Sequence, residues 1–227
     1  MIGTPRVHHR VADSTNQRAK ELAAAGAPHG TLVTAGEQTA GRGRQGRTWV
    51  APAGSAVLMS VVLRELDERF PLVPLVAAVA VAEACESIAP VSCAIKWPND
   101  VWVERRKVAG ILVEGRPAEG WAVLGIGLNV EPVEFPEELS SIATSLQLSG
   151  GVPLALRAVL SSLSVWLGRG VPEVLEAWRA RDALRGEHLR WDGGSGVAAG
   201  IDDGGSLLVE TDGGLVTLGA GEVHLQR

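Results

Sequence analysis

The chain has 227 residues, 46% of them hydrophobic, and carries a formal net charge of −5. This length supports one substantial core with a small second unit, and the composition is that of a globular protein. The negative balance argues against bulk electrostatic binding to nucleic acid, so any basic site must be local.

Cysteine usage and apolar patterning predict the compartment. Cys85 and Cys93 are the two cysteines, without a C-x-x-C pair or a secretion signal, which predicts reduced thiols and a cytoplasmic setting. The most apolar segment, residues 72–85, is interrupted by Pro74 and Glu83. We expect it to be too short to span a bilayer, which predicts no membrane association.

The first predicted element is a helix that begins after Ser14. Ser14 is a favourable N-cap, and Gln17 three residues later completes a capping box, while Gly26 marks the helix end. Apolar periodicity then predicts strands at residues 31–35, 56–63, 94–96, 108–114 and 121–130, and helices at residues 71–88, 140–148, 154–167 and 172–184. Residues 97–100 read as a turn between elements.

The composition changes after Arg185. Residues 186–227 are rich in glycine, with paired turn motifs separated by short apolar runs. This spacing predicts a small all-β barrel of about five strands. We therefore divide the chain into residues 1–184, an α+β core, and residues 185–227, the C-terminal barrel.

Residues 41–49 read Gly-Arg-Gly-Arg-Gln-Gly-Arg-Thr-Trp, so glycine alternates with arginine. Glycine lets a backbone approach a ligand closely. Arg42, Arg44 and Arg47 supply fixed positive charge that binds carboxylate or phosphate. The stretch therefore predicts a loop that can hold two anions against each other.

Two phosphate-binding patterns match this loop as text. Gly41, Gly43 and Gly46 satisfy G-x-G-x-x-G, and the same stretch nearly satisfies a P-loop, with Arg47 in place of its lysine. Both motifs need a helix directly after the loop, but proline and glycine follow where the first helical turns would lie. We therefore reject both motifs, which leaves an ordinary solvated basic loop as the plain alternative to an anion site.

Further segments accompany the loop in a fixed order. They are Ser-Thr-Asn at residues 14–16, Glu-Gln-Thr-Ala at 37–40, Lys-Trp-Pro-Asn-Asp at 96–100, Lys-Val-Ala-Gly-Ile-Leu-Val-Glu at 107–114 and Gly-Ile-Gly-Leu-Asn at 125–129. Together they resemble the biotin–protein ligase family over nearly the whole chain. The resemblance implies a mixed β-sheet flanked by helices, as in class II synthetases, followed by a small C-terminal β-barrel.

The resemblance also implies a reaction in two steps. Biotin and ATP with Mg²⁺ give biotinyl-5′-AMP and pyrophosphate, and a lysine of a biotin carboxyl carrier domain of a carboxylase then attacks the adenylate. Some members carry an N-terminal winged helix and act as repressors. Because the catalytic segments here begin at Ser14, we expect a ligase that does not bind DNA.

By resemblance, particular residues hold each substrate, and no metal ligands are assigned. Arg42, Arg44 and Lys107 are the expected catalytic residues. The expected biotin contacts are Ser14, Thr15, Asn16, Gln38, Arg42, Gly43, Arg44 and Lys107, and the expected nucleotide contacts are Arg44, Arg47, Trp49, Lys96, Asn99 and Asn129.

Plainer interpretations stay open for some of these residues. Ser14 could serve only as a helix cap, and Lys107 follows three charged residues and could be one more solvated charge. Asp100 could orient Asn99 or the acceptor amine, or simply hold a turn.

Rival functions stay open as well. A lipoate or octanoyl ligase or transferase can use the same fold, although such transferases need a reactive cysteine, and Cys85 and Cys93 read as core residues. A non-catalytic nucleotide or nucleic-acid binding module is the alternative from another class.

Overall fold

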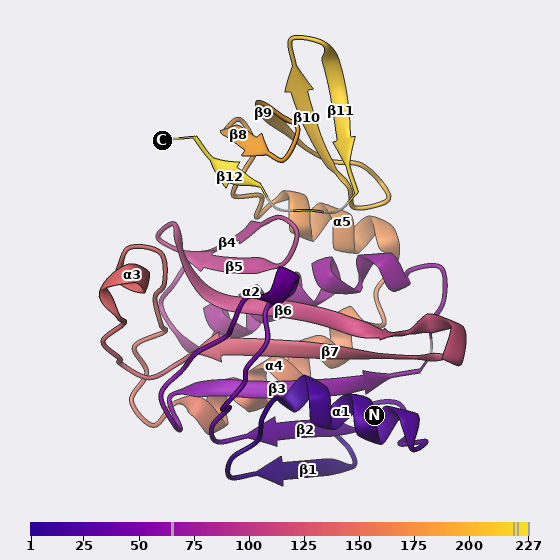
Figure 1. The fold of residues 1–227 in the computed structure, drawn as a ribbon, viewed down its shortest axis with the longest axis vertical. Helices are drawn as coiled ribbons and strands as arrows, with labels where there is room; N and C mark the ends of the chain where they lie inside the picture. Colours follow the sequence, from indigo (N-terminus) through magenta and orange to yellow (C-terminus); the bar gives the residue numbers. More distant parts are fainter. Residues whose placement is uncertain (65, 220, 222, 227) are drawn as a thin grey trace.

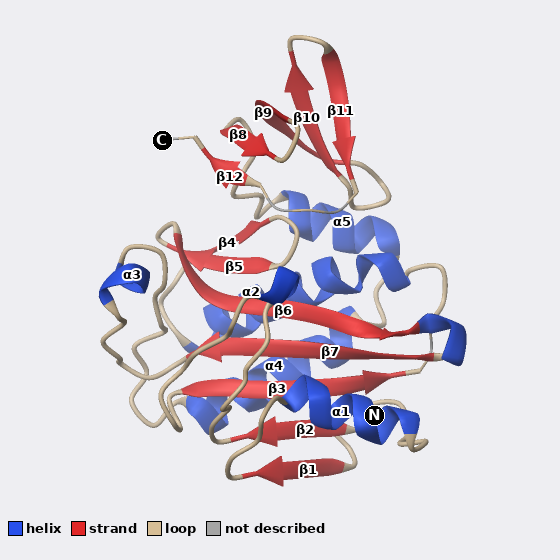
Figure 2. Ribbon diagram, viewed as in Figure 1, coloured by secondary structure: helices blue, strands red, loops and turns tan. Residues whose placement is uncertain are grey.

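The computed structural model describes residues 1–64, 66–219, 221 and 223–226. Its described strands form a larger sheet of seven and a smaller sheet of five. The smaller sheet lies beyond the β4–β5 edge of the larger sheet (Figure 1). Helices cover both faces of the larger sheet (Figure 2).

The larger sheet is mixed, as the resemblance implies. It comprises β1 (Arg6–His9), β2 (Leu32–Ala35), β3 (Ala56–Leu63), β4 (Cys93–Lys96), β5 (Asp100–Val103), β6 (Arg106–Arg116) and β7 (Trp121–Asn129), in the spatial order β1-β2-β3-β7-β6-β5-β4. β1 and β2 pair in parallel, and all the other neighbours pair antiparallel. β3 is buried along its whole length and is apolar except at Ser60, because both of its faces are covered.

Helices cover the two faces of this sheet differently. α1 (Thr15–Ala24) lies over β2, β3 and β7 on one face, and α2 (Val73–Ile88) and α4 (Val152–Trp166) lie on the other. α2 is apolar on nearly all sides because it is enclosed by the sheet, α4 and α5 (Val171–Arg179). The core of the molecule therefore lies on the α2 face, and α1 leaves part of its own face uncovered.

The expectation that the apolar segment is too short to span a bilayer is wrong in one respect. A short 3₁₀ turn continues into α2, so Phe70–Ile88 forms 19 helical residues with a mean hydropathy of 1.6, long and apolar enough to cross a membrane. Two thirds of its most apolar window, 67%, is buried inside the protein. Its apolar side chains therefore pack mainly in the protein core, and α2 is a core helix.

Two segments that the sequence predicts to be helical are not helical, because their backbone groups bond to strands of the larger sheet. Only α3 (Glu137–Ser140) is helical near the expected helix at residues 140–148, because the backbone there bonds to the ends of β6 and β7. Thr144 N–H donates to Lys107 C=O, and Leu146 N–H donates to Asn129 C=O. α5 likewise stops at Arg179, because the chain beyond it pairs with Ile95 of β4.

Sequence analysis did not predict two of the strands. β1 is short and polar at the sheet edge, so it lacks an apolar alternation. β5 begins at Asp100, inside the segment expected to be a turn, and pairs with both β4 and β6.

The C-terminal domain is all-β, as expected. It comprises β8 (His188–Trp191), β9 (Gly194–Ile201), β10 (Leu207–Thr211), β11 (Gly214–Leu218) and β12 (His224–Leu225). All pairings are antiparallel, in the order β11-β10-β9-β8-β12, and the glycine-containing turn motifs connect consecutive strands from β8 to β11. Among the described residues β11 and β12 are the end strands, so the pairings form an open sheet. The expected domain boundary near residue 185 stays a prediction.

Candidate active site

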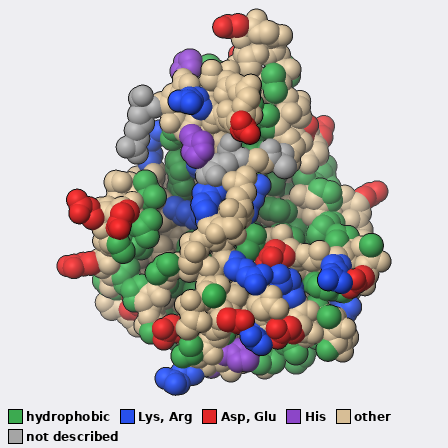
Figure 3. All heavy atoms as spheres, in the orientation of Figure 1, with side chains coloured by type: hydrophobic (Ala, Val, Ile, Leu, Met, Phe, Trp, Pro, Cys, Tyr) green, Lys and Arg blue, Asp and Glu red, His purple; other side chains and the backbone are tan. Residues whose placement is uncertain are grey.

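A cavity of about 110 Å³ lies on the α1 face of the larger sheet, beside the N-terminus of α1. The loop at residues 41–49 crosses β6 and β7 there and covers the cavity where the helix does not (Figure 1). Lys and Arg side chains gather on both sides of the segment that crosses this face (Figure 3). The structure thus brings a largely exposed basic loop over a hollow in an acidic protein, with its arginines along the lining of that hollow.

The loop is a small closed hairpin. Gly43 N–H donates to Arg47 C=O at 2.7 Å, and Trp49 N–H donates to Gly41 C=O at 3.0 Å. A Cβ on Gly41 would lie 2.3 Å from the Trp49 carbonyl oxygen. Glycine at this position therefore allows the two arms of the loop to lie close together. No helix follows the loop, which confirms the rejection of the P-loop and dinucleotide motifs.

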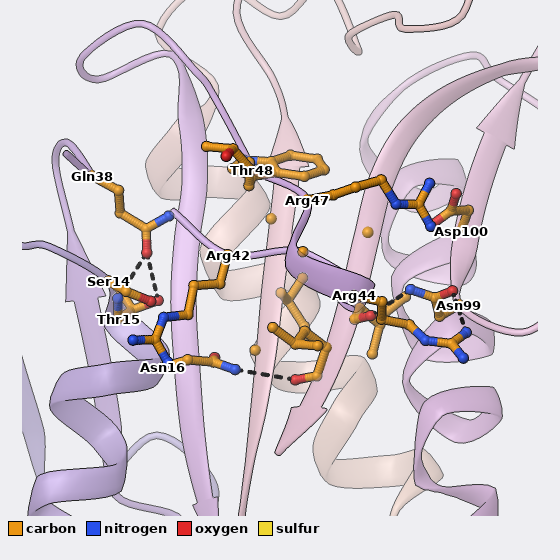
Figure 4. Close-up of a pocket in the computed structure, with 18 of the residues that line it drawn as sticks. Ser14, Thr15, Asn16, Gln38, Arg42, Arg44, Arg47, Thr48, Asn99 and Asp100 are labelled. Carbon is orange, nitrogen blue, oxygen red and sulfur yellow. Dashed lines mark hydrogen bonds between the residues drawn. The ribbon is translucent and has the colours of Figure 1, made fainter. Parts of the chain in front are cut away.

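The loop arginines point in different directions (Figure 4). Arg42 extends toward the start of α1, where its Nη1 lies 3.8 Å from Glu114 Oε1. Arg44 Nη1 donates to Asn99 Oδ1 at 3.1 Å, and Arg47 points toward Asp100. The charges are therefore spread along the cavity: Arg42 lies toward one end, and Arg44 and Arg47 lie toward the Asn99–Asp100 segment at the other.

Lys107 reaches the cavity because of a β-bulge. The β5–β6 register shifts between Val101 and Trp102, so that Ala109 faces Val101 while Lys107 faces Trp102. The extra residue in β6 changes the alternation, and Lys107 and Gly110 face the same cavity although three positions separate them. The plain interpretation of Lys107 as a solvated charge is therefore wrong.

Asp100 is the one carboxylate among the described residues that line the cavity, and it lies 2.7 Å from Lys107 Nζ. Lys107 also lies over the ring of Trp49, 5.6 Å from its centroid. The neighbouring Asn99 donates from Nδ2 to Ile111 C=O at 2.7 Å, which leaves its Oδ1 to accept from Arg44. This segment thus holds two of the cations that face the cavity.

The start of α1 is capped from outside the helix. Ser14 occupies the N-cap position, but its side chain makes no capping hydrogen bond, so the expected capping box is wrong. Gln38 Oε1 instead accepts from Thr15 N–H at 2.7 Å and from Thr15 Oγ1 at 3.1 Å. Because Gln38 does the capping, the Ser14 side chain stays on the cavity wall.

A buried hydrogen-bond network fixes the Asn16 side chain. Ser60 Oγ donates to Asn16 Oδ1 at 2.6 Å, and Asn16 Nδ2 donates to Glu114 Oε2 at 2.9 Å. Lys20 Nζ lies 2.9 Å from the other oxygen of Glu114. Burial alone would raise the pKa of Glu114, but the hydrogen bonds from Asn16 and Lys20 outweigh it, and the pKa lies below its usual value.

The floor of the cavity depends on glycine. A Cβ on Gly125 would lie 2.0 Å from Asn16 Oδ1, and one on Gly127 would lie 2.4 Å from the Trp49 ring. Alternate residues of β7 face the same side, so both glycines open the same surface. Trp49 lies in the space above Gly127, and its Nε1 is buried with no hydrogen-bond partner among the described residues.

Most of the expected site residues meet in this cavity. Its lining includes Ser14, Thr15, Asn16, Gln38, Arg42, Gly43, Arg44, Arg47, Trp49, Asn99 and Lys107. Lys96 and Asn129 are not among them. Lys96 lies over the Trp102 ring, and the buried Asn129 donates to Thr144 C=O, so neither side chain lines the cavity.

Sequence analysis missed residues that support the site. Ser60 and Glu114 lie beneath and beside Asn16, and Gly110, Gly125 and Gly127 form the floor. The alternation of side chains along β6 and β7 could have identified these residues. Gly110, Leu112 and Glu114, for example, share one side of β6. Cys85 and Cys93 are core residues as expected. A hydrogen bond with Cys93, together with burial, raises the pKa of the Cys85 thiol.

Comparisons with known proteins agree with this geometry. Residues 8–131 match the biotin/lipoate A/B protein ligase family, and residues 195–225 match the biotin protein ligase C-terminal domain. The chain is 35% identical, over 99% of its length, to 75% of the bifunctional ligase/repressor BirA of Bacillus subtilis. It is 36% identical, over 94% of its length, to 86% of the biotin–[acetyl-CoA-carboxylase] ligase of Mycobacterium tuberculosis.

A solved structure shows the same architecture. The biotin protein ligase from Aquifex aeolicus in complex with biotin and ATP has a TM-score of 0.86 and 30% identity, and the match covers 99% of each chain. The chain therefore belongs to the biotin/lipoate A/B protein ligase family. Within that family it groups with the biotin–protein ligases, which confirms the resemblance and the assignment to ATP-dependent ligases.

The glycine floor gives a test of the geometry. Gly125→Ala places a Cβ against Asn16, so we expect a loss of about 1–3 kcal/mol in the free energy of unfolding, typical of overpacking. Gly213→Ala is the control, because its Cβ meets only Thr211 Oγ1 at 3.7 Å. Denaturant unfolding measures both variants, and equal midpoints would contradict the packing described.

Proposed function

We propose that Arg42, Arg44, Arg47 and Lys107 join the carboxylate of biotin to the α-phosphate of ATP, and that the chain then transfers biotin to a lysine of a carrier domain. The observation that carries the proposal is the convergence of these four cations on one cavity. A site for two anions needs this arrangement, and a site for one neutral ligand does not.

The cations offset a specific cost of the first step. Two negative charges about 4 Å apart repel by about 4 kcal/mol at an effective dielectric constant of about 20. Lys107 and Arg44 stand at the β6 end of the cavity, on strand and loop respectively, and stabilise the charge that develops as the carboxylate oxygen attacks phosphorus. Pyrophosphate leaves with the electron pair of the broken P–O bond.

The opposite end of the cavity suits the uncharged ring system of biotin. Ser14, Thr15, Asn16 and Gln38 present hydroxyl and amide groups there, and the network through Ser60 and Glu114 fixes the amide of Asn16. Neutral donors and acceptors held in one orientation discriminate a ligand by its hydrogen-bonding pattern. Trp49 supplies a flat apolar surface beside the nucleotide.

In the second step the acceptor amine attacks the carbonyl carbon of the adenylate. A new C–N bond forms, the C–O bond to phosphate breaks, and AMP leaves with that electron pair while the amine loses a proton. We propose a biotin carboxyl carrier domain as the acceptor, a cytoplasmic setting, and no role for DNA or a membrane. The relative from Mycobacterium tuberculosis is named for acetyl-CoA carboxylase, which supports the choice of acceptor.

We propose that Mg²⁺ arrives with ATP. Among the described residues no group of three or more His, Cys, Asp or Glu side chains could hold a metal ion. Asp100 is the carboxylate that lines the cavity among the described residues. Mg²⁺ is commonly held by one or two carboxylates together with substrate phosphates. The donor set therefore fits an ion bound mainly by the nucleotide, which would neutralise phosphate charge.

Labelled pyrophosphate exchange into ATP tests the proposed function. We expect exchange that depends on biotin, because adenylate formation is reversible. Exchange that depends on lipoate instead would select a lipoate ligase, and polynucleotide binding without any exchange would select a non-catalytic module.

Removing single cations tests the roles of Arg44 and Lys107. We expect Arg44→Ala and Lys107→Ala each to lower the rate of adenylate formation by about 10²-fold or more, the scale of losing one preorganised donor. Circular dichroism should show an unchanged fold, because both side chains lie at the cavity rather than in the core. Near-normal rates in both variants would remove the mechanism.

Ligand binding should also change the loop. The cavity of about 110 Å³ is small beside the roughly 300–1,000 Å³ of typical ligand sites, so the loop must move to admit substrates. We expect trypsin to cleave at Arg42, Arg44 and Arg47 more slowly with biotin and ATP bound, as followed by mass spectrometry. Equal cleavage with and without ligands would contradict a loop that orders over the adenylate.

A further inference from the structure

The C-terminal domain contacts the larger sheet through one buried hydrogen bond. Trp97 is 2% exposed, and its Nε1 donates to the Gly205 carbonyl oxygen at 2.9 Å. Gly205 belongs to the turn between β9 and β10, whereas Trp97 follows β4 directly. This buried contact links the C-terminal sheet to the segment that leads into the site, and a part-buried contact reaches the loop, where Arg44 Nη2 donates to Gly221 C=O at 3.3 Å.

That segment carries the partners of two site cations. Asn99, two residues after Trp97, accepts from Arg44 at 3.1 Å, and Asp100 lies 2.7 Å from Lys107. A shift of the Trp97 ring would move both partners, because only Pro98 separates Trp97 from Asn99. The position of the two cations therefore depends on where this segment is held.

Packing alone does not hold the segment on the side of the C-terminal domain. A cavity of about 380 Å³ adjoins Trp97, Pro98 and Asn99, with the 204–206 turn on its other side. The segment has open space on that side, so the Trp97 hydrogen bond is a directional contact across it, while bonds between Asn99 and Ile111 hold the segment on the β6 side. The turn itself is fixed, because Asp202 Oδ1 accepts from the N–H groups of Gly204 and Ser206 at 2.9 and 2.8 Å.

We propose that Trp97 is a positioning residue, through which the C-terminal domain aligns Asn99 and Asp100 and so places Arg44 and Lys107 for adenylate formation. The proposal rests on the proposed function. It gives the C-terminal domain a part in the first chemical step, although no described strand of that domain lines the catalytic cavity.

Other contacts between the domains provide a matched control. Arg179 Nη2 donates to Ile201 C=O at 3.1 Å and to Asp203 Oδ1 at 2.9 Å. Neither partner touches a residue of the catalytic cavity. Arg179→Met therefore loosens the attachment of the same domain without acting on the Trp97–Asp100 segment.

Trp97→Phe tests the proposal by removing the donor and keeping an aromatic ring. We expect kcat for biotin-dependent pyrophosphate exchange to fall about tenfold, the rate equivalent of one buried hydrogen bond, with a smaller change in KM for biotin. KM should change less because the proposed contacts of the biotin ring system, on α1 and Gln38, lie at the other end of the cavity. Arg179→Met should leave both constants within about twofold, a change well below one such bond.

A second readout separates failure of this proposal from failure of the proposed function. Acetylation of Lys107 by an activated ester, followed by mass spectrometry, reports its pairing with Asp100 without any turnover. We expect several-fold faster labelling in Trp97→Phe and not in Arg179→Met. Should Trp97→Phe fail to fold, Asp202→Ala loosens the turn that presents Gly205 and should change both readouts in the same direction.

Each outcome decides the question. Unchanged kcat and unchanged labelling in Trp97→Phe would overturn the proposal, as would equal effects in Arg179→Met. A wild-type enzyme without biotin-dependent exchange would overturn the proposed function, and the labelling of Lys107 would then still decide whether Trp97 positions the pair.

Discussion

The arrangement of the site depends on holding like charges close together. Lys107 and the loop arginines face one small cavity. The adjacent Asp100 and Asn99 accept from Lys107 and Arg44, and Glu114, on another wall, lies near Arg42. Without these acceptors the cations would repel one another and turn outward to water. Asp100 and Glu114 lie on β5 and β6, and Asn99 directly precedes β5, so the sheet and its adjoining turn carry the partners while a loop carries much of the charge.

The sheet also has to make room for the side chains it positions. Gly125 and Gly127 leave space for Asn16 and for the Trp49 ring, which a Cβ on either glycine would occupy. Bulky apolar residues on the same strand face the core on the other side. The glycines of β7 therefore face the cavity, and its bulky residues at alternate positions face the core. This follows from the two-residue period of a strand.

The sequence predicted much of the fold and many of the residues that meet in the cavity, but little of what holds them. Local patterns identified β3 and α2 because each is a continuous apolar run, and they identified the C-terminal strands because glycine-containing turn motifs separate them at regular intervals. The pairs that hold the site join distant positions: Asn16 and Glu114 are 98 residues apart, and Arg44 and Asn99 are 55 apart. Propensity has no information on such pairs, and the same tertiary contacts replaced the expected helix at residues 140–148 with backbone bonds to β6 and β7.

Trp49 differs from the other polar side chains of the site in its hydrogen bonding. Its Nε1 is buried and has no partner within the described residues, although its ring is well packed against Gly127 and lies near Lys107. A buried donor without an acceptor costs about 1–3 kcal/mol. A rotation of the ring, or an acceptor brought to Nε1, would remove that cost. Trp49 N–H also closes the loop by donating to Gly41 C=O, so this donor lies on the same segment as the three arginines, and the loop's packing and its charges are coupled through one short hairpin.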